Sequence, residues 1–159
     1  MPEIIYKPIG TVHSPFKEPG GTPIQPAASD AEGAVEVFPE YAPGLKDLDG
    51  FSHIILLYHF HRSGKPNLVV KPFMDTESRG IFAIRAPSRP NSIGMSVVRL
   101  LRVDGCILHV RGLDILDGAP LLDIKPYVPK FDSVDAERIG WLGENVRKLE
   151  TARDDGRFC

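Results

Sequence analysis

Cysteines and long apolar stretches are both scarce in this chain. Its 159 residues include only Cys106 and Cys159, too few for a disulfide framework, so we expect a cytoplasmic protein in a reducing compartment. Apolar runs such as residues 54–57 are far shorter than the roughly 20 residues of a membrane-spanning helix. The first residues, Met-Pro-Glu, are not typical of a signal peptide. We therefore expect a protein that does not enter a membrane.

An excess of charge and the familiar nucleotide motifs are missing as well. Nineteen basic residues against twenty-one acidic ones leave a net charge of -2, so a nucleic acid would have to bind at a local patch. There is no G-x-G-x-x-G and no G-x-x-x-x-G-K-[ST] motif, which disfavours a Rossmann methyltransferase and a P-loop enzyme. The G-x-S-x-G turn of serine hydrolases is also absent.

Short β-rich segments recur along the chain and predict its fold. Hydrophobic residues make up 42% of the sequence, enough for the core of one domain. With Asp104-Gly105 as a tight hairpin signal, the spacing predicts a mainly β fold, a single β-barrel of short strands, over alternating strands and helices. The apolar run at residues 54–57 indicates a strand buried on both faces. The predicted strands are residues 4–12, 34–38, 51–61, 68–71, 80–84, 95–102, 106–111 and 121–125.

Helical and irregular segments are predicted elsewhere. Four prolines between residues 13 and 33 prevent a regular element there, and loops of this length are usually functional or disordered. Residues 41–48 could hold one helical turn. Ser133 can cap a later helix whose apolar face would contain Ile139, Leu142, Val146 and Leu149. We therefore expect a barrel domain over residues 1–134, followed over residues 135–159 by this helix and a polar tail that frays.

The first of three polar clusters, residues 85–96, has the composition of a binding loop. Its prolines restrict the backbone and so lower the entropy lost when Arg85, Arg89 and Asn91 are held in place. Arginine suits carboxylates and phosphates because its planar guanidinium offers paired donors. The same composition fits a rigid surface loop whose arginines pair with local acids, and that alternative stays open.

The second cluster, residues 113–127, places carboxylates at a strand end, in a turn and inside a strand. Asp117-Gly118 is an ordinary turn pair. Asp123 lies among apolar residues, so it is predicted to be buried with a charged partner, for which an arginine of the first cluster is a candidate.

The third cluster contains His59 and His61, which alternation would place on one strand face. Two such histidines could contribute to a metal site. However, the sequence has no thiolate pair and no H-E-x-x-H motif, and histidines two residues apart more often serve as hydrogen-bonding or stacking partners. We therefore expect no metal.

Taken together, these clusters resemble the TrmO family, also described as YaeB-like or TsaA-like proteins. The family segment R-x-x-x-R-P-N-P-I-G-M-S corresponds to residues 85–96, with Ser92 in place of a proline. The segment D-G-T-P-V-x-D-I-K-P-Y corresponds to residues 117–127, with Ala119 in place of threonine. Residues 9–17 and 51–53 extend the resemblance.

This resemblance implies a β-barrel that binds S-adenosylmethionine without a Rossmann sheet. It also implies a homodimer with the cofactor near the subunit interface. Its implied reaction is methyl transfer to the exocyclic nitrogen of threonylcarbamoyl-adenosine, the modified base beside the anticodon, so tRNA is the expected partner.

Candidate site residues follow by position. Asp117 and Asp123 are expected to support the cofactor site. We expect Arg89, Asn91, Lys125 and Tyr127 to contact the substrate. The residues expected to bind the cofactor are Pro26, Ala27, Ala28, His61, Arg62, Arg85, Met95, Gly112, Leu113, Asp114 and Ile115.

The attacked amine must lose a proton, and Asp114, Asp117 and His61 are candidates for accepting it, without a ranking. Two other functions stay open. One is a regulatory module that binds S-adenosylmethionine or a nucleotide without chemistry. The other is a small metalloenzyme built on His59 and His61.

Overall fold

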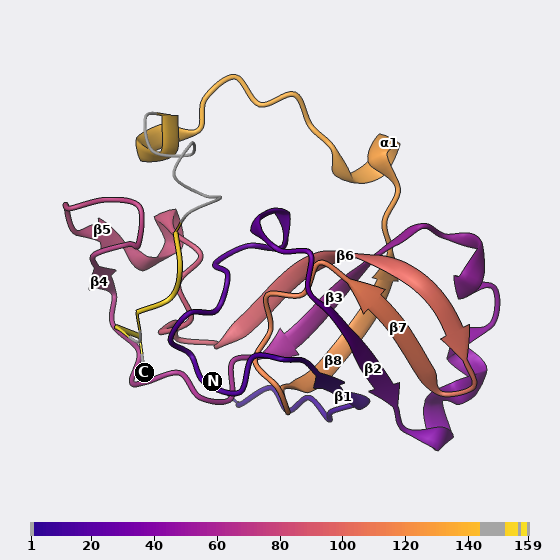
Figure 1. Ribbon diagram of the computed structural model, residues 1–159. Coiled ribbons are helices and arrows are strands. Elements are labelled where there is room, and N and C mark those ends of the chain that lie inside the picture. The colour runs from indigo at the N-terminus through magenta and orange to yellow at the C-terminus, as the bar shows by residue number, and fades with distance from the viewer. Residues whose placement is uncertain (1, 144–151, 156, 159) are drawn as a thin grey trace.

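Six antiparallel strands form a closed barrel (Figure 1). The computed structural model describes residues 2–143, 152–155, 157 and 158. The strands follow one another around the barrel in the order β1-β2-β7-β6-β3-β8, and β8 pairs with β1 to close it. The mainly β barrel predicted from the sequence is therefore confirmed. Its strands are β1 Gly10–His13, β2 Glu32–Val37, β3 His53–His59, β6 Ile93–Asp104, β7 Ile107–Arg111 and β8 Pro120–Pro126.

Alternating side chains fill the inside of the barrel. Along β3, Ile54, Leu56 and Tyr58 are buried, whereas Ile55 and Leu57 between them are only half-buried. This alternation is what a strand shows when only one of its faces meets the core. The prediction that residues 54–57 are buried on both faces is therefore wrong, because the outward face of β3 is not fully covered.

Two glycines permit tight features of the barrel wall. Gly105 has a φ of +61° in the two-residue turn between β6 and β7, so the Asp104-Gly105 hairpin signal is confirmed. Gly94 lies opposite Tyr58 in the β3–β6 pairing, and a Cβ atom at residue 94 would stand 2.4 Å from the Tyr58 ring. The absence of a side chain at Gly94 thus leaves the space that the ring occupies.

A smaller substructure lies beside one end of the barrel (Figure 1). It contains the two-stranded sheet of β4 Val69–Val70 and β5 Arg79–Gly80, followed by the 3-10 helix η4 Ile81–Ala83. The strand predicted over residues 80–84 is therefore wrong beyond Gly80. A second apolar cluster holds this region together. Its buried members are Val70, Ile81, Ile84, Ala86 and Phe158.

The other helical elements are short. The turn expected within residues 41–48 is present as two 3-10 helices. Within the described residues, no helix is long and apolar enough to cross a membrane. The elements are η1 Pro26–Ala28, η2 Pro39–Leu45, η3 Leu48–Gly50, α1 Pro129–Asp132 and η5 Gly140–Gly143.

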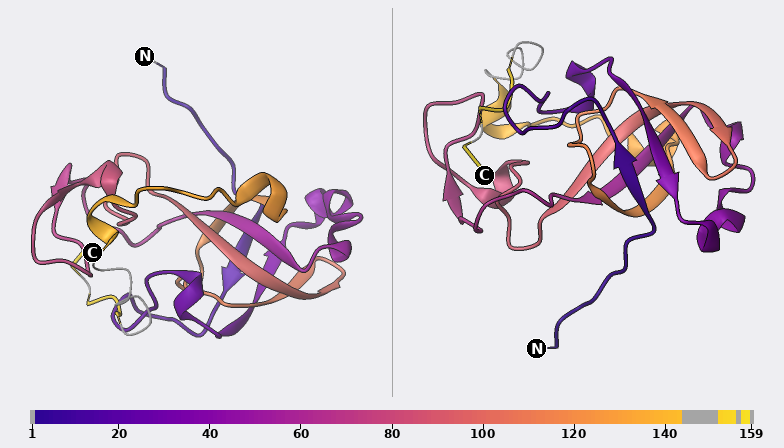
Figure 2. Two further views of the ribbon diagram at one scale, coloured as in Figure 1. Left: turned by 90° about the horizontal axis from the view of Figure 1, so that it is seen from above. Right: turned by 60° about the horizontal axis from the view of Figure 1, so that its bottom comes forward.

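The first predicted strand is too long at its beginning. Residues 2–9 run away from the barrel (Figure 2), and pairing begins only where the Ile9 N–H donates to the Leu121 carbonyl. Pro8 has no N–H to donate, which is one reason for a late start. Ile4 and Ile5 are consequently exposed.

The helix predicted from Ser133 is also wrong over the residues that the structure describes. Ser133 is extended and residues 133–139 are not helical. Gly140 has a φ of +59°, which does not fit a right-handed helix, and among the described residues it begins the four-residue 3-10 helix η5. Val146 and Leu149 lie outside the described residues. Within the predicted polar tail, the described residue Phe158 is 5% exposed and therefore packed, and the division at residue 134 stays a prediction.

Candidate active site

A cavity of about 1060 Å³ lies between the barrel wall and the loops beside it. Segments far apart in sequence meet there: the proline-rich loop with η1, the end of β3, the segment around η4, the outward face of β6 and the β7–β8 connection. Most of the residues expected to bind a cofactor line it. These are Pro26, Ala27, His61, Arg62, Arg85, Met95, Gly112, Asp114 and Ile115.

Leu113, from the same prediction, does not line the cavity. Leu113 is fully buried in the barrel core, and its carbonyl accepts a hydrogen bond from Ser29 Oγ at 2.5 Å. It therefore anchors the connection instead of lining the cavity. Ala28 is the last residue of η1.

Arg62 and Arg85 hold the proline-rich loop, defined here as residues 15–26. Arg62 contacts Glu18 at 2.9 Å and donates to the Lys17 carbonyl at 3.0 Å. Arg85 donates to Gln25 Oε1 at 3.2 Å. The two guanidinium groups thus both line the cavity and fix its opposite wall.

The residues assigned to the substrate are dispersed. Arg89 lines the cavity, but its Nη1 donates to the carbonyls of Ile81, Ile84 and Ala86, at 2.7 Å for Ile84, and so shapes its own loop. Asn91, Lys125 and Tyr127 do not line the cavity. The structure brings together the cofactor residues more completely than the substrate residues.

Asp123 does not have the environment predicted for it. Its side chain is 46% exposed and pairs with Lys125 at 3.0 Å, not with an arginine of residues 85–96. The prediction of a buried carboxylate is wrong because Asp123 belongs to a half-buried stretch of β8, where water and a lysine both reach the carboxylate. Asp123 also lies outside the cavity.

Asp114 is the carboxylate of the cavity wall. Ser96 Oγ donates to Asp114 Oδ1 at 2.6 Å, and the Tyr58 hydroxyl lies 3.1 Å from the same Ser96 oxygen. Burial raises the pKa of Asp114 to about 7, against the smaller lowering effect of the Ser96 bond. Burial, followed by the charge of Asp114, raises the pKa of Tyr58. Asp114 can therefore exchange a proton near neutral pH.

Asp117 lies elsewhere, in a shallow groove with Lys17 and Ser14. It contacts Lys17 Nζ at 2.9 Å and accepts the Ser14 N–H at 2.9 Å. The Lys17 side chain, followed by the Ser14 N–H, lowers the pKa of Asp117. Asp117 is thus a stable anion that fixes the start of the proline-rich loop.

His59 and His61 both line the cavity, but β3 ends at His59 and His61 lies in the following turn. The expectation that strand alternation places both on one face is therefore wrong. Burial, then the nearby His59 and Arg62, lowers the pKa of His61, so its imidazole is neutral at pH 7. Within the described residues, no group of three histidine, cysteine or acidic side chains could hold a metal ion.

Comparison with known proteins agrees with this geometry. Residues 11–133 match the tRNA-methyltransferase O N-terminal domain. The chain belongs to the TrmO family. The crystal structure of TrmO from Pseudomonas aeruginosa superposes with a TM-score of 0.74 at 38% identity, covering 88% of this chain and 63% of that one.

Two relatives of this TrmO-family chain differ in length. It is 64% identical over 156 residues to a "Probable S-adenosyl-L-methionine-binding protein" of Pyrococcus abyssi, covering 98% of this chain and 85% of that protein. It is 36% identical to the tRNA (adenine(37)-N6)-methyltransferase of Mus musculus, over 82% of this chain but only 32% of the mouse protein.

Sequence reasoning missed several cavity residues of this TrmO-family protein. Tyr58 lines the cavity, and Ser96, which does not, bonds to Asp114 of its wall. Both occupy inward positions of their strands, so alternation along β3 and β6 could have identified them as buried polar groups next to the site. Trp141, Asp154 and Phe158 also line the cavity. No local pattern predicts their position, because it depends on how the chain returns after the barrel is complete.

Proposed function

We propose that the protein is an S-adenosylmethionine-dependent methyltransferase that modifies tRNA. The observation that supports this most directly is the convergence of Pro26, His61, Arg85, Met95 and Asp114 in one cavity. These residues come from separate segments and were assigned to the cofactor from their positions in the family motifs. The acceptor we propose is the exocyclic nitrogen of threonylcarbamoyl-adenosine beside the anticodon.

The cavity has the chemistry that S-adenosylmethionine requires. Its volume of about 1060 Å³ lies at the upper end of the range for small-molecule sites. Apolar side chains such as Met95 and Ile115 suit an adenine ring, while Arg62 and Arg85 offer positive charge to the carboxylate of the amino-acid part. S-adenosylmethionine supplies a methyl group on a sulfonium sulfur, which is electrophilic without a metal.

The protein's own contribution is positioning and proton acceptance. Holding two reactants in line can supply about 7 to 11 kcal/mol of a barrier, and a cavity wall fixed by Arg62 and Arg85 serves that purpose. The attacked amine loses a proton, and Asp114 is the best acceptor because it lines the cavity with a pKa of about 7. His61, neutral at pH 7, is the second candidate. Asp117 is the weakest, since Lys17 holds its charge in another groove.

Methyl transfer tests this proposal directly. Purified protein is incubated with S-adenosylmethionine labelled in the methyl group and bulk tRNA, and the digested nucleosides are analysed by mass spectrometry. We expect one labelled methyl group on threonylcarbamoyl-adenosine. Asp114→Asn should lower turnover strongly, whereas Asp104→Asn, the same change at an exposed carboxylate that does not line the cavity, should retain most of it.

Other outcomes would redirect the assignment. Label in a different nucleoside would show that the proposed acceptor is wrong, whereas the proposed reaction, methyl transfer to tRNA, is right. Tight binding of S-adenosylmethionine with no transfer to any tRNA nucleoside would favour the regulatory binding module. The name of the Pyrococcus abyssi relative mentions binding only, and this is the reason to test for binding without transfer.

A homodimer and a cytoplasmic location complete the proposal. Both come from the family resemblance and the sequence composition. Light scattering measures the mass in solution, and a monomer of 17.5 kDa that binds S-adenosylmethionine tightly would contradict a site shared between subunits.

A further inference from the structure

Part of the cavity wall comes from residues that follow the family domain. The family match ends at residue 133, yet Trp141, Leu142, Asp154 and Phe158 line the same cavity as Asp114 and Arg85. These four residues are called the C-terminal wall below. In Figure 1 the yellow trace of the described C-terminal residues runs beside the substructure that contains β4 and β5.

Phe158 is the anchor of this wall. Its side chain is 5% exposed, packs in the cluster of Val70 and Ile81, and meets the Phe73 ring edge-on at 5.0 Å between centroids. Its carbonyl accepts hydrogen bonds from the Gly64 N–H at 2.7 Å and from Ser88 Oγ at 3.0 Å. Phe158 thus ties together segments on both sides of η4.

Arg157 adds a second attachment beside the anchor. Its Nη1 donates to the carbonyls of Lys71 and Pro72 at 3.2 and 3.0 Å, and its guanidinium lies 5.0 Å from the centre of the Phe73 ring. These contacts fix the backbone next to Phe158 by bonds that do not depend on the apolar cluster.

Just before the anchor, the chain pairs with the proline-rich loop. Arg153 forms an antiparallel bridge with Pro23, the Gly21 N–H donates to the Asp154 carbonyl at 2.7 Å, and the Asp154 N–H donates to the Thr22 carbonyl at 2.9 Å. The loop is therefore held on one side by Arg62 and Arg85 and on the other by this short ladder. Phe158 lies four positions after Asp154 in the sequence.

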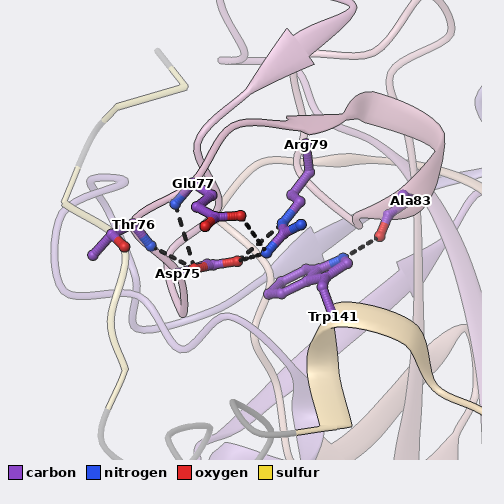
Figure 3. Close-up of polar contacts among 6 residues, drawn as sticks. All are labelled: Asp75, Thr76, Glu77, Arg79, Ala83 and Trp141. Carbon is purple, nitrogen blue, oxygen red and sulfur yellow. Dashed lines mark hydrogen bonds and ion pairs between the residues drawn. The ribbon is translucent and has the colours of Figure 1, made fainter.

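Trp141 lines another side of the cavity, and Figure 3 shows its contacts with the residues around it. Its indole N–H donates to the Ala83 carbonyl at 2.8 Å, and the Arg79 guanidinium lies 5.8 Å from the centre of its ring. Asp75 fixes that guanidinium through hydrogen bonds from Nε and Nη2 at 2.9 and 2.6 Å. Trp141 is the only tryptophan of the chain, so its fluorescence reports on this wall alone.

We propose that the C-terminal wall is a required part of the cofactor site and that it positions the proline-rich loop for binding. The domain that matches the family is therefore not a complete site in this protein. Without the Phe158 side chain, the segment that forms the ladder at residues 153 and 154 is held only by the Arg157 and backbone contacts, and the ligand must supply part of the order of the loop when it binds.

Point variants of the full chain test this inference, which rests on S-adenosylmethionine as the ligand. Phe158→Ala should weaken S-adenosylmethionine binding by about tenfold or more in calorimetry, since a loop that is only partly preformed reduces the apparent affinity. Phe158→Leu should restore most of the affinity. Phe131→Ala is the matched control, because Phe131 is 81% exposed and does not line the cavity. It should bind like wild type.

A second control separates loop positioning from general loss of stability. Leu100→Ala removes a buried barrel side chain that does not line the cavity, so it should lower the melting temperature and leave the affinity of the folded protein unchanged. Trypsin cleavage after Lys17 should be about tenfold faster in Phe158→Ala and unchanged in Leu100→Ala. In wild type, S-adenosylmethionine should change the Trp141 emission.

The outcomes distinguish the two proposals. Wild-type protein that fails to bind S-adenosylmethionine at millimolar concentration would overturn the cofactor assignment and this inference together. Normal wild-type binding with equal affinity in Phe158→Ala would overturn the inference alone. Weaker binding without faster cleavage at Lys17 would refute the loop-positioning part, since the loop would then be intact.

Discussion

Asp114 makes the stability of this protein depend on pH in an unusual direction. Burial raises the pKa of Asp114 from 3.8 to about 7, which means that the folded protein holds a proton that the unfolded chain releases. At about 1.4 kcal/mol per pH unit, keeping this carboxylate charged in the folded state costs about 4 kcal/mol above pH 7. Replacing it by a neutral group of the same shape should remove the cost.

Asp114→Asn is that replacement, because its amide oxygen can still accept the Ser96 hydroxyl. A group whose pKa is raised on folding favours the folded state at low pH and loses that advantage as the pH rises through the folded pKa. The free energy of unfolding of the variant should therefore equal that of wild type near pH 4, exceed it by a growing margin up to about pH 7, and remain higher above pH 7. At about 2–4 °C per kcal/mol, its melting temperature at pH 8 should be roughly 10 °C higher.

Asp117→Asn is the control, because this substitution should change the stability in the opposite direction. Lys17 lowers the pKa of Asp117, so this carboxylate stabilises the folded state above its ordinary pKa and loses the effect as the solution becomes strongly acidic. Because Lys17 is largely exposed, the loss at pH 7 should not exceed about 1 kcal/mol. Thermal melts of both variants from pH 4 to pH 8 decide the matter. An Asp114→Asn protein no more stable than wild type at pH 8 would refute the buried, near-neutral carboxylate.

Three further substitutions have clear expectations. Arg85→Ala should weaken S-adenosylmethionine binding about tenfold by calorimetry, because Gln25 loses its donor, and should leave the melting temperature nearly unchanged. Asp123→Ala should change stability by less than about 1 kcal/mol in denaturant titration, since its pair with Lys125 is exposed. Gly94→Ala should cost about 1–3 kcal/mol in the same assay, because the new methyl group would meet the Tyr58 ring.

The barrel was predictable because its information is local. Alternation and turn residues identify β2, β3, β6, β7 and β8 to within a few residues, and Asp104-Gly105 marks the one two-residue hairpin. The errors occur where burial, not pattern, decides the structure. Residues 4–8 have the composition of a strand but no partner within this chain's described part. Of the strand predicted over residues 80–84, residues 81–83 instead form a 3-10 helix that buries Ile81.

The cavity was only partly predictable for a related reason. Motif positions identified Arg85, Met95 and Asp114, since these lie in continuous segments of distinctive composition. Asp123 looked buried from its neighbours along the chain, but its exposure depends on what covers β8 from outside. Phe158 looked like part of a polar tail, yet it is buried by residues about seventy to ninety positions earlier, including Val70 and Ala86.

The closed barrel explains why the site depends on such distant contacts. Its interior is filled by side chains such as Leu56 and Leu108, so a ligand has to bind against the outside of the wall. The remaining walls of the cavity are loops, which lack the continuous backbone hydrogen bonds that hold strands in place. Their order must come from separate contacts, here Arg62 to Glu18, Arg85 to Gln25 and the bridge of Pro23 to Arg153. Cofactor affinity in this fold should therefore respond more to changes at these loop contacts than to equally destabilising changes inside the barrel.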